Sequence, residues 1–571
     1  MNPDPRPLTP DPSRSRVLIA LAFAAVLFAV WLPCIRLAFG KNASYYMFGY
    51  VGDEYCYAQR MQPLIAGTTP NNPINGICDP NVISPFFLED ALRSFLTVTG
   101  IHVITLFWAW RILFPIAFGA SLGVLASACL SRRRPWSLML CAAAGAAVMA
   151  LQYFAYDCVT TYPPFQGWLQ RVPTNIEYLL SALVAAAYLR FIDLPDKRRG
   201  MMLALSSAIL IYLRPYVAIP WGLAIGSGMI WLLISRRMTW RIGATTCATL
   251  LLALIPLLMI MSCNSSSPAY RQMTLRYFGI VDYRVNEFWP VYIAAAAALA
   301  VSTLWTAKRQ HVFVLSAAVA IVAYTFVSGL FSFSWELLAI DRLGAFYLIM
   351  LAAAGLLCMK TTVLQWRGTA GAAAARRWTS IFAAAAVLMS AGVAWRNLNL
   401  DFSTYKCSQY AGTRIDLPFI PAYDWIREKT PEDALFIVDD GYDWSQNPRY
   451  NRNGQLMLTL LSPTKTQPLF RDDFFLLVAR RRCAWSNRLY GNVLSDNDLV
   501  LLTYLHRGTF GLPVPEMDYF AALKTFRPAY ILWRKRTPFP RGYGQRLQAA
   551  SEIAYSDDHC EIWKLDVDRV K

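Results

Sequence analysis

The chain has 571 residues and a formal net charge of +18. Hydrophobic residues make up 56% of it and charged residues only 16%, whereas soluble globular chains carry roughly 25% charged residues. The apolar residues come in long blocks, so lipid must solvate much of this chain. Lys and Arg collect on the cytoplasmic loops of membrane proteins, and no nucleic-acid-binding motif is present, so no nucleic-acid partner is expected.

The first 16 residues are polar and rich in proline, which predicts a disordered cytoplasmic tail. An apolar run of more than twenty residues follows this tail. A cleavable signal peptide has a shorter apolar core and a small-residue cleavage site. We therefore expect an uncleaved first transmembrane helix.

Hydropathy predicts eleven membrane spans, most of them about 17 to 25 residues long. The expected spans are 17–39, 104–130, 136–155, 175–192, 200–213, 216–235, 241–262, 289–307, 311–330, 342–359 and 378–395. The fifth span is short and meets Arg214-Pro215, where the proline should break a helix. Residues 200–235 form either two spans or one kinked span, and the count of eleven assumes two.

Basic residues occur mainly on every second segment, which places the N-terminus inside. The predicted inner segments hold Arg132, Arg133, Arg134, Arg190, Lys197, Arg198, Arg199, Arg236, Arg237, Arg241, Lys308, Arg309, Lys360, Arg367, Arg376 and Arg377. An odd number of spans then places the C-terminus outside. Most acidic residues fall on outer segments, which indicates that any chemistry takes place on the outer face.

Residues 397–571 differ in kind from the preceding part, because their apolar runs are short and their charges frequent. AYDWIREKT is typical of an amphipathic helix, and TPEDALFIVDDG, FRPAYILWRK and HCEIWKLDV are typical of short strands. The sequence thus predicts a polytopic helical membrane domain at 17–396, with a long first outer loop at about 40–103. A soluble, extracytoplasmic α/β domain is expected to follow at 397–571.

The twelve cysteines include no CxxC pair and no Cys/His cluster, so a zinc or iron–sulfur site is not expected. Cys56 and Cys78 share the first outer loop. They form either a disulfide or two free thiols.

The first outer loop carries the adjacent carboxylates Asp53 and Glu54, followed by Tyr55 and Tyr57. A carboxylate near the membrane surface can act as a general base on an acceptor hydroxyl, or it can bind a divalent cation. It can also be a solvated loop acid without a catalytic role.

A long first outer loop with an acidic pair and a tyrosine just after the first span resembles the GT-C superfamily. These membrane glycosyltransferases use polyprenyl-phosphate-linked sugars and include protein O-mannosyltransferases and the aminoarabinose transferase of lipid A. In the aminoarabinose type the segment reads like D-E-x-x-Y, and here it is Asp53-Glu54-Tyr55-Cys56-Tyr57. The number of spans, the first loop and the C-terminal domain match that architecture.

The resemblance implies that Asp53 is the catalytic or metal-coordinating carboxylate, with Glu54 as the alternate. A second functional acid occurs in the next outer loop of some such families, and Asp157 stands at that place. A Mg²⁺ or Mn²⁺ ion held by Asp53 and Asp157 is one alternative, and a metal-free site is the other.

Residues 84–96, SPFFLEDALRSFL, place apolar side chains mainly on one side of a helix. This pattern is typical of a helix lying on the outer leaflet, although a helix packed on the bundle would share it. In the resembled superfamily such helices frame the active site.

Arg111, Arg214 and Arg342 flank outer membrane edges. Charges near spans usually mark function or pairing. The three arginines are therefore candidates to bind the phosphate of a lipid donor, with snorkelling to headgroups as the alternative.

The predicted function is transfer of a sugar from a polyprenyl-phosphate donor on the outer face of the cytoplasmic membrane. The acceptor is a glycan, a lipid or a protein. One rival is a polymerase or ligase of the O-antigen type, which usually lacks so large a C-terminal domain. Another is a lipid or solute transporter or flippase, which should show repeated halves and ionisable residues at mid-membrane. A catalytically inactive assembly protein is the third.

Overall fold

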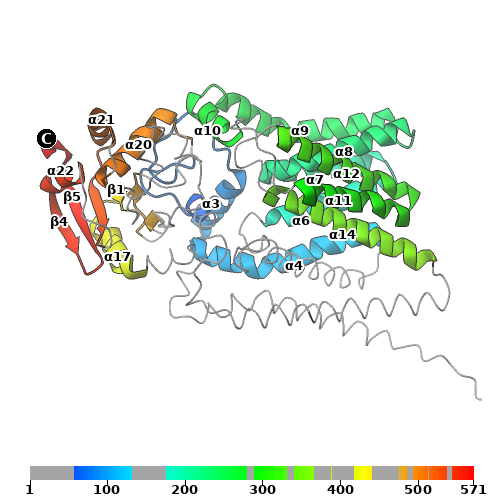
Figure 1. Ribbon diagram of the computed structural model, residues 1–571, viewed down its shortest axis with the longest axis horizontal. Helices are drawn as coiled ribbons and strands as arrows, with labels where there is room; N and C mark the ends of the chain where they lie inside the picture. Colours follow the sequence, from blue (N-terminus) through cyan, green and yellow to red (C-terminus); the bar gives the residue numbers. More distant parts are fainter. Residues whose placement is uncertain are drawn as a thin grey trace, which may run out of the picture. The chain divides into compact units, whose positions relative to one another are not determined.

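The computed structural model describes residues 57–130, 175–278, 289–330, 340–365, 388, 417–439, 475–476, 479–484, 493–511, 514–535 and 543–570. This part of the chain is mostly helical, and a small sheet forms in its C-terminal region (Figure 1). That confirms the coarse fold class expected from the sequence. The predicted tail at 1–16 and the spans at 17–39, 136–155 and 378–395 lie outside the described residues.

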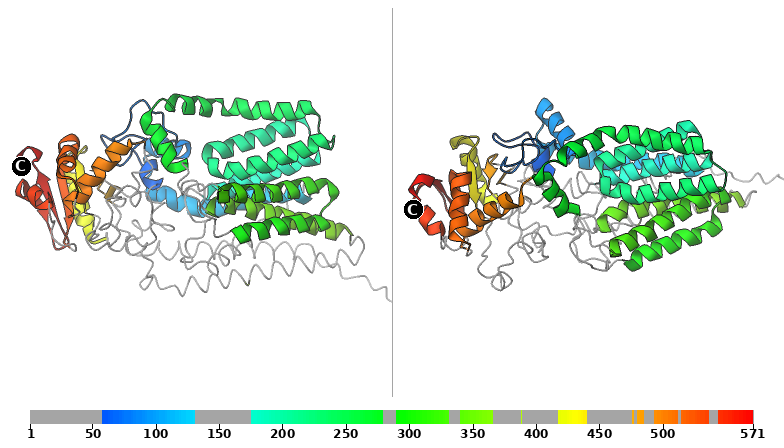
Figure 2. Two further views of the ribbon diagram at one scale, coloured as in Figure 1. Left: turned by 45° about the horizontal axis from the view of Figure 1, so that its top comes forward. Right: turned by 90° about the horizontal axis from the view of Figure 1, so that it is seen from above.

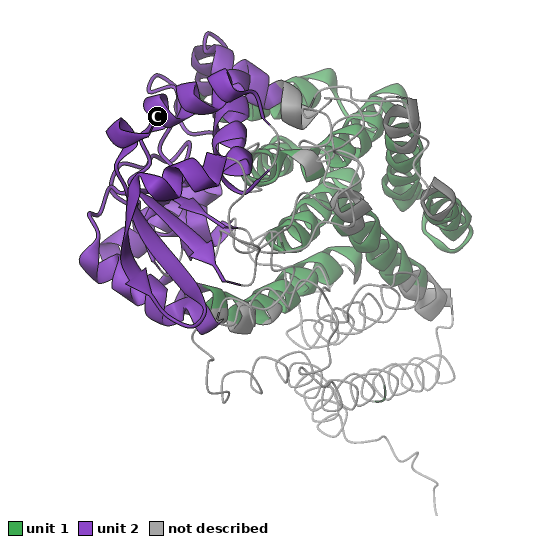
Figure 3. Cartoon of the chain, turned by 60° about the vertical axis from the view of Figure 1, so that its left-hand side comes forward, with its two compact units in different colours: residues 1–44, 107–256, 280–401 green, residues 45–106, 257–279, 402–571 purple. Residues whose placement is uncertain are grey.

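The chain divides into two compact units (Figure 3). Unit 1 consists of residues 1–44, 107–256 and 280–401, and unit 2 consists of residues 45–106, 257–279 and 402–571. Unit 2 therefore combines the first loop, a segment from the middle of the chain and the C-terminal region. The predicted boundary at residue 397 lies outside the described residues.

Long apolar helices build most of unit 1 and lie side by side (Figure 2), and the first residues of α4 and the last residues of α9 belong to unit 2. Their bounds agree closely with eight of the predicted spans. They are α4 (Val103–Leu130), α6 (Ile176–Asp193), α7 (Lys197–Leu213), α8 (Pro215–Ile234), α9 (Trp240–Asn264), α11 (Trp289–Ser302), α12 (His311–Leu330) and α14 (Ile340–Gln365). The short turns η4 (Thr303–Trp305) and η5 (Lys308–Gln310) join α11 to α12.

The chain breaks between α7 and α8 at Arg214, as the Arg-Pro pair predicts. Arg214 has φ −148° and ψ 71°, which lie outside the helical region, and Pro215 takes the first position of α8. Proline suits that position because its missing N–H has no helical partner there. The two helices pack against each other, so residues 200–235 form two helices and not one kinked helix.

Aromatic and small side chains interlock the core of unit 1. The rings of Trp221 and Phe346 meet edge to face at 4.8 Å, and so do those of Phe118 and Tyr178 at 6.2 Å. The hydroxyl of the fully buried Tyr188 lies 2.9 Å from both the carbonyl oxygen of Ala224 and Oγ of Ser316. Burial of that polar group is tolerated because both contacts are hydrogen bonds.

Two helical segments in the described part of the chain, Val217–Ile234 and Trp240–Asn264, are long and apolar enough to cross a membrane. At 1.5 Å per residue, the 25 residues of α9 span about 37 Å, more than the roughly 30 Å of a bilayer core. Most of its apolar side chains are exposed, Leu252 by 67% and Met259 by 62%. An apolar helix with so much exposed surface needs an apolar surrounding.

A five-stranded mixed sheet forms the centre of the C-terminal part of unit 2, with strand order β2-β1-β3-β5-β4. β1, β2 and β3 are parallel, whereas β5 pairs antiparallel with both β3 and β4. The strands are β1 (Leu435–Val438), β2 (Arg482–Cys483), β3 (Tyr530–Arg534), β4 (Ser551–Ser556) and β5 (Cys560–Leu565). The sheet contains the three strands predicted from the sequence.

Helices accompany these strands, and α20, α21 and α22 lie between strands in the chain, as the alternating pattern predicts. They are η6 (Leu417–Phe419), α17 (Ile420–Lys429), α20 (Asp496–Thr509), α21 (Glu516–Phe526), α22 (Tyr543–Ala549) and η9 (Val567–Arg569). The first loop adds α3 (Phe87–Thr99), and the middle segment adds α10 (Pro268–Phe278).

The close packing of α8 against Tyr188 gives a stability prediction. A Cβ atom on Gly228 would lie 1.7 Å from the Tyr188 hydroxyl, whereas one on Gly226 of the same helix meets nothing within 4 Å. Gly228→Ala should lower the free energy of unfolding by about 1–3 kcal/mol through overpacking, and Gly226→Ala should not lower it. Thermal unfolding of the purified variants measures this, and equal melting temperatures for the two would contradict the packing described.

Candidate functional site

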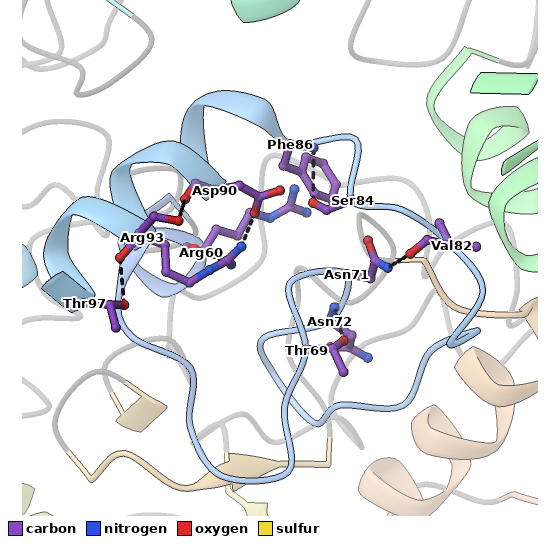
Figure 4. Close-up of polar contacts among 11 residues, drawn as sticks. Arg60, Thr69, Asn71, Asn72, Val82, Ser84, Phe86, Asp90, Arg93 and Thr97 are labelled. Atoms are coloured by element: carbon purple, nitrogen blue, oxygen red, sulfur yellow. Dashed lines mark hydrogen bonds and ion pairs between the residues drawn. The ribbon is translucent and has the colours of Figure 1, made fainter. Parts of the chain in front are cut away.

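The residues that follow the predicted catalytic acids, Asp53 and Glu54, are buried in unit 2. Residues 57–61 are helical, and Gln59, Arg60 and Gln62 are almost fully buried polar residues. The guanidinium of Arg60 lies 3.6 Å from the centre of the Phe86 ring, a cation–π contact (Figure 4). Arg60 is therefore a further charged residue close in sequence to Asp53 and Glu54, and its burial could not be read from the sequence.

Helix α3 anchors this segment through a buried charged face. Arg93 donates from Nη1 to the carbonyl oxygen of Arg60 at 3.0 Å and forms an ion pair with Asp90 (Figure 4). Glu89 and Arg93 are both buried, together with Leu88 and Leu96. The conformation of the chain after the acidic pair thus depends on the charged side of α3.

An asparagine-rich turn links the first loop to the C-terminal sheet. The side chain of Asn72 donates to Oδ1 of Asn75 at 2.6 Å and to the carbonyl oxygen of Ile77 at 2.7 Å. Asn75, fully buried, donates in turn to the carbonyl oxygen of Ala484 at 3.2 Å. Beside it, the N–H of Cys483 in β2 donates to the carbonyl oxygen of Ile74 at 3.0 Å. The loop therefore covers the outer edge of strand β2.

The turn is tight enough to require glycine. Gly76 has φ +80°, and a Cβ there would lie 1.8 Å from the carbonyl oxygen of Gly67. Only glycine fits such a position without moving the backbone.

The middle segment also contacts the first loop within unit 2. The side-chain amide of Asn264 exchanges two hydrogen bonds with the backbone of Ile83, at 2.9 and 2.8 Å. A small apolar cluster lies beside them and draws on the three segments of the unit. Its buried members are Val82, Ala269, Met273 and Val493, with Phe86 and Tyr270 packed against them.

Three consecutive arginines precede and enter β2, and each has different surroundings. Buried Arg481 donates to the carbonyl oxygens of Arg427 and Thr430, at 2.6 and 2.7 Å, where α17 ends. Arg482 donates to the carbonyl oxygen of Asp433 at 2.8 Å. Arg480 is exposed and has the left-handed φ of +53°. The ARRRC run at 479–483 is the sequence signal of this basic segment.

A polar cluster occupies one end of the helices of unit 1. We call it the Arg214 cluster, and its described side chains are Trp110, Asn175, Glu177 and Arg214. The indole N–H of Trp110 in α4 donates to Oδ1 of Asn175 at 2.8 Å. Glu177, in the first turn of α6, is only 2% exposed, and Arg214 only 6%.

The packing of the helices explains why these residues share one end. α6 and α7 are consecutive helices of 18 and 17 residues joined by three residues, so the beginning of α6 lies beside the end of α7. The indole N–H of Trp221 donates to Oγ of Ser181 at 3.1 Å and fixes α8 against α6. Glu177 and Arg214 lie one and two helical turns beyond that bond, at the same end.

Arg111 and Arg342 were also predicted to bind the donor phosphate. Their backbone positions lie at the same end of the helices as Arg214. Arg111 follows Trp110 directly in α4, and Arg342 lies one turn of α14 before Phe346, whose ring contacts Trp221. Their side chains lie outside the described part, so the structure leaves their roles as predictions. Of the three predicted arginines, Arg214 is the one whose side chain the structure describes. Buried Glu177 is a residue of the cluster that was not predicted from the sequence.

The three predicted acids, Asp53, Glu54 and Asp157, lie outside the described residues, and so does Cys56. Cys78 has a free thiol, and its Sγ lies 3.1 Å from Oγ1 of Thr69. Burial raises the pKa of this thiol. Among the described residues, no group of three or more His, Cys, Asp or Glu side chains is placed to hold a metal ion.

Comparison with known proteins does not place the chain. No protein-family model matches it, and the search of curated proteins gives no match.

The capping of α4 gives a pH prediction. The N–H of Ile104 donates to Nδ1 of His102 at 3.3 Å, a bond that requires an unprotonated nitrogen. Burial lowers the pKa of His102 below its usual 6.5, and the charge of Arg480 lowers it further. The unfolded state then binds more protons, so the free energy of unfolding should fall as the pH drops below about 6.5 and level off below the folded pKa.

Unfolding measured between pH 8 and pH 5 in steps of about half a unit tests this direction. His102→Asn should reduce the loss of stability at low pH, because asparagine can also cap a helix but does not titrate. His559→Asn, at a histidine between β4 and β5 and outside the cap of α4, is the control and should leave the loss in place. The same acid-side loss in His102→Asn as in the parent would refute the assignment.

Proposed function

We propose that the protein is a membrane glycosyltransferase that transfers a sugar from a polyprenyl-phosphate donor to a glycan, lipid or protein acceptor. The observation that carries the proposal is buried Arg214, at the N-terminus of α8 and at the same end as the N-termini of α6 and α14. Helix N-termini and an arginine both favour an anion. A lipid-linked phosphate offers that anion together with an apolar tail.

The apolar helices of unit 1 support a membrane location for this chemistry. The proposed topology has eleven spans with the N-terminus cytoplasmic and the C-terminal domain on the outer side of the cytoplasmic membrane. The three segments that form unit 2 are all outer segments in that topology. Segments that form one compact unit must lie on the same side of the membrane, so their association in unit 2 supports the proposed topology. The acidic pair and tyrosine at 53–57 supply the likeness to the GT-C superfamily.

In the proposed reaction, the acceptor hydroxyl attacks the anomeric carbon of the donor sugar. The bond from that carbon to the phosphate oxygen breaks, and polyprenyl phosphate leaves with both bonding electrons. Asp53 takes the proton of the acceptor hydroxyl, with Glu54 and Asp157 as the alternates. Arg214, Arg342 and Arg111 hold the phosphate. A divalent cation at Asp53 and Asp157 stays an open alternative, since phosphate and carboxylate oxygens both suit Mg²⁺.

Two rival functions share the lipid phosphate or the membrane location. A polymerase or ligase of the O-antigen type would also use arginines on the outer side, and it would join glycans already linked to lipid. A transporter or flippase would move its substrate without breaking a glycosidic bond. Detection of a new glycosidic bond would exclude a transporter or flippase. The size of the transferred glycan would distinguish the proposed transferase from a polymerase or ligase of the O-antigen type.

The donor-binding role of Arg214 can be tested by substitution. A lost charge-assisted hydrogen bond to phosphate should cost about 1.5–3 kcal/mol, or roughly 10- to 150-fold in donor affinity. Arg214→Gln should show this loss in binding of a polyprenyl phosphate, and Arg214→Lys should recover part of it. Arg241→Gln, at an exposed arginine of α9, is the control and should bind normally. If folded Arg214→Gln retains the parent affinity, Arg214 has only a structural role.

The catalytic role of Asp53 gives a separate prediction. Asp53→Asn keeps the size of the side chain and removes its charge and basicity, so transfer should slow by about 10²–10⁴-fold. Donor binding should change far less. Transfer by purified protein in lipid, at matched expression, is the measurement. A near-parent rate in Asp53→Asn would move the catalytic role to Glu54 or Asp157.

A further inference from the structure

Three connecting segments of unit 1 meet around one arginine, at the opposite end of α7 from Arg214. Arg237, in the turn between α8 and α9, donates from Nη2 to the carbonyl oxygen of Ile192 near the end of α6 at 3.2 Å. Its Nη1 donates to the carbonyl oxygen of Arg309, in η5, at 3.4 Å. We call the joined segments 190–199, 235–239 and 303–310, all of them in unit 1, the Arg237 junction. The 17 residues of α7 separate it from Arg214 by about 25 Å.

Exposed cations come together at this junction. Each of the three segments contributes some of them, and they are Arg190, Lys197, Arg198, Arg236, Lys308 and Arg309. The acids of the same segments are Asp193 and Asp196, and Asp196 pairs with Arg199 at 3.4 Å. The cations therefore outnumber the acids, and the hydrogen bonds of Arg237 hold the segments that carry them together. A surface of this charge attracts anions.

One of these cations occupies a position that usually belongs to glycine. Arg236 follows the end of α8 with φ +54°, and the N–H of Arg237 donates to the carbonyl oxygen of Leu232 at 3.0 Å. Many helices end in this way with glycine in the left-handed position. A non-glycine residue there is uncommon, and such strain often occurs at functional positions. The exposed charge of Arg236 is therefore a candidate for a binding role.

Exposed apolar side chains lie in or beside the same turns. Ile234 at the end of α8 is 80% exposed, Trp240 at the start of α9 70%, Leu304 76% and Trp305 52%. Tryptophan is enriched at the membrane interface, where its ring lies at the level of the headgroups. A soluble acidic protein or a nucleic acid would use the cations and leave these side chains in water. A phospholipid uses both, because its phosphate lies next to its acyl chains.

We propose that the Arg237 junction binds an anionic phospholipid with two phosphates, of the cardiolipin type, in the inner leaflet. Arg236, Lys308 and Arg309 bind the phosphates, and the acyl chains lie against the apolar side chains beside them. Two phosphates suit the junction because its cations belong to separate turns, and basic surfaces between helices on the cytoplasmic side suit such headgroups. The inner leaflet follows from the proposed topology, in which these turns are cytoplasmic. The inference rests on the proposed membrane location and does not depend on glycosyl transfer.

Native mass spectrometry of the full-length protein, titrated in detergent with cardiolipin or with phosphatidylcholine, tests the site. Cardiolipin should bind more tightly, and a variant with both Lys308→Gln and Arg309→Gln should lose affinity for it by about fivefold for each charge removed. This variant should fold, because Arg237 binds the backbone of Arg309 and not its side chain. The control carries Lys429→Gln and Lys524→Gln, removes two exposed charges from unit 2 and should bind cardiolipin as the parent does.

Arg236 allows binding to be separated from folding. Arg236→Gly removes the charge, and glycine suits the left-handed φ, so the melting temperature should stay the same or rise. Affinity for cardiolipin should nevertheless fall about fivefold. Arg236→Lys should keep most of the affinity, because the charge remains.

Four outcomes would overturn the inference. Equal affinities for cardiolipin and phosphatidylcholine would show that charge does not select the lipid. Parent-like cardiolipin affinity in both Arg236→Gly and the double variant at 308 and 309 would place the lipid elsewhere. Displacement of cardiolipin by inorganic pyrophosphate would indicate a site for free phosphates. Labelling of Lys308→Cys from outside intact cells, above that of the parent, would place the junction on the outer face. Loss of glycosyl transfer alone changes none of these readouts, so failure of the proposed function is distinguishable.

Discussion

The structure of unit 2 depends on the hydrogen bonds that join the first loop to strand β2. This strand has two residues and lies at the edge of the sheet, where unpaired backbone groups would otherwise be open to other chains. The carbonyl oxygen of Ile74 and the side chain of Asn75 pair with Cys483 and Ala484 instead. Each bond contributes only about 1 kcal/mol, but a buried group left without it would cost more.

The partners of these bonds are separated by about four hundred residues of sequence. The loop must therefore be in place before the sheet edge is complete, which makes the contact slow to form and long-range. The conformation of the first loop depends in turn on the C-terminal sheet. The segment that follows the acidic pair is tied to α3 through Arg60 and Arg93, and the same loop is tied to β2 through its asparagines. The position of the proposed catalytic loop is thus linked to the fold of the C-terminal region.

The sequence predicted the helices well because hydrophobic length and proline are local signals. The break at Arg214-Pro215 and the strand at Leu435–Val438 were both readable from a few adjacent residues. For α3 the sequence indicated an apolar side but not which of its residues are covered: Leu88 and Leu96 are buried, whereas Phe95 is 48% exposed. Spacing alone gives the periodicity of a helix, whereas the element packed against it decides which side is covered.

What the sequence could not supply were contacts between distant segments. Nothing local to Asn75 indicates Ala484 as its partner. Nothing local to Glu177 indicates that this acid, in the first turn of α6, is buried. The left-handed φ of Arg480 is also a tertiary effect, because both neighbours are fixed by their own contacts. Asp53, Glu54 and Asp157 rest on sequence pattern and resemblance, since the described structure does not include them.

Arg214 and Arg480 show two different surroundings for an arginine side chain, one buried at the end of α7 and the other exposed before β2. Burial of Arg214 removes water from the guanidinium, which is unfavourable unless anionic or polar groups replace that water. The helix N-termini at the same end carry positive partial charge themselves and raise that requirement. Arg480 keeps its water but occupies a strained backbone conformation, held there by the buried residues on either side. Under the proposed function, the buried guanidinium of Arg214 would gain most from a phosphate that arrives with few waters, such as that of a lipid-linked donor.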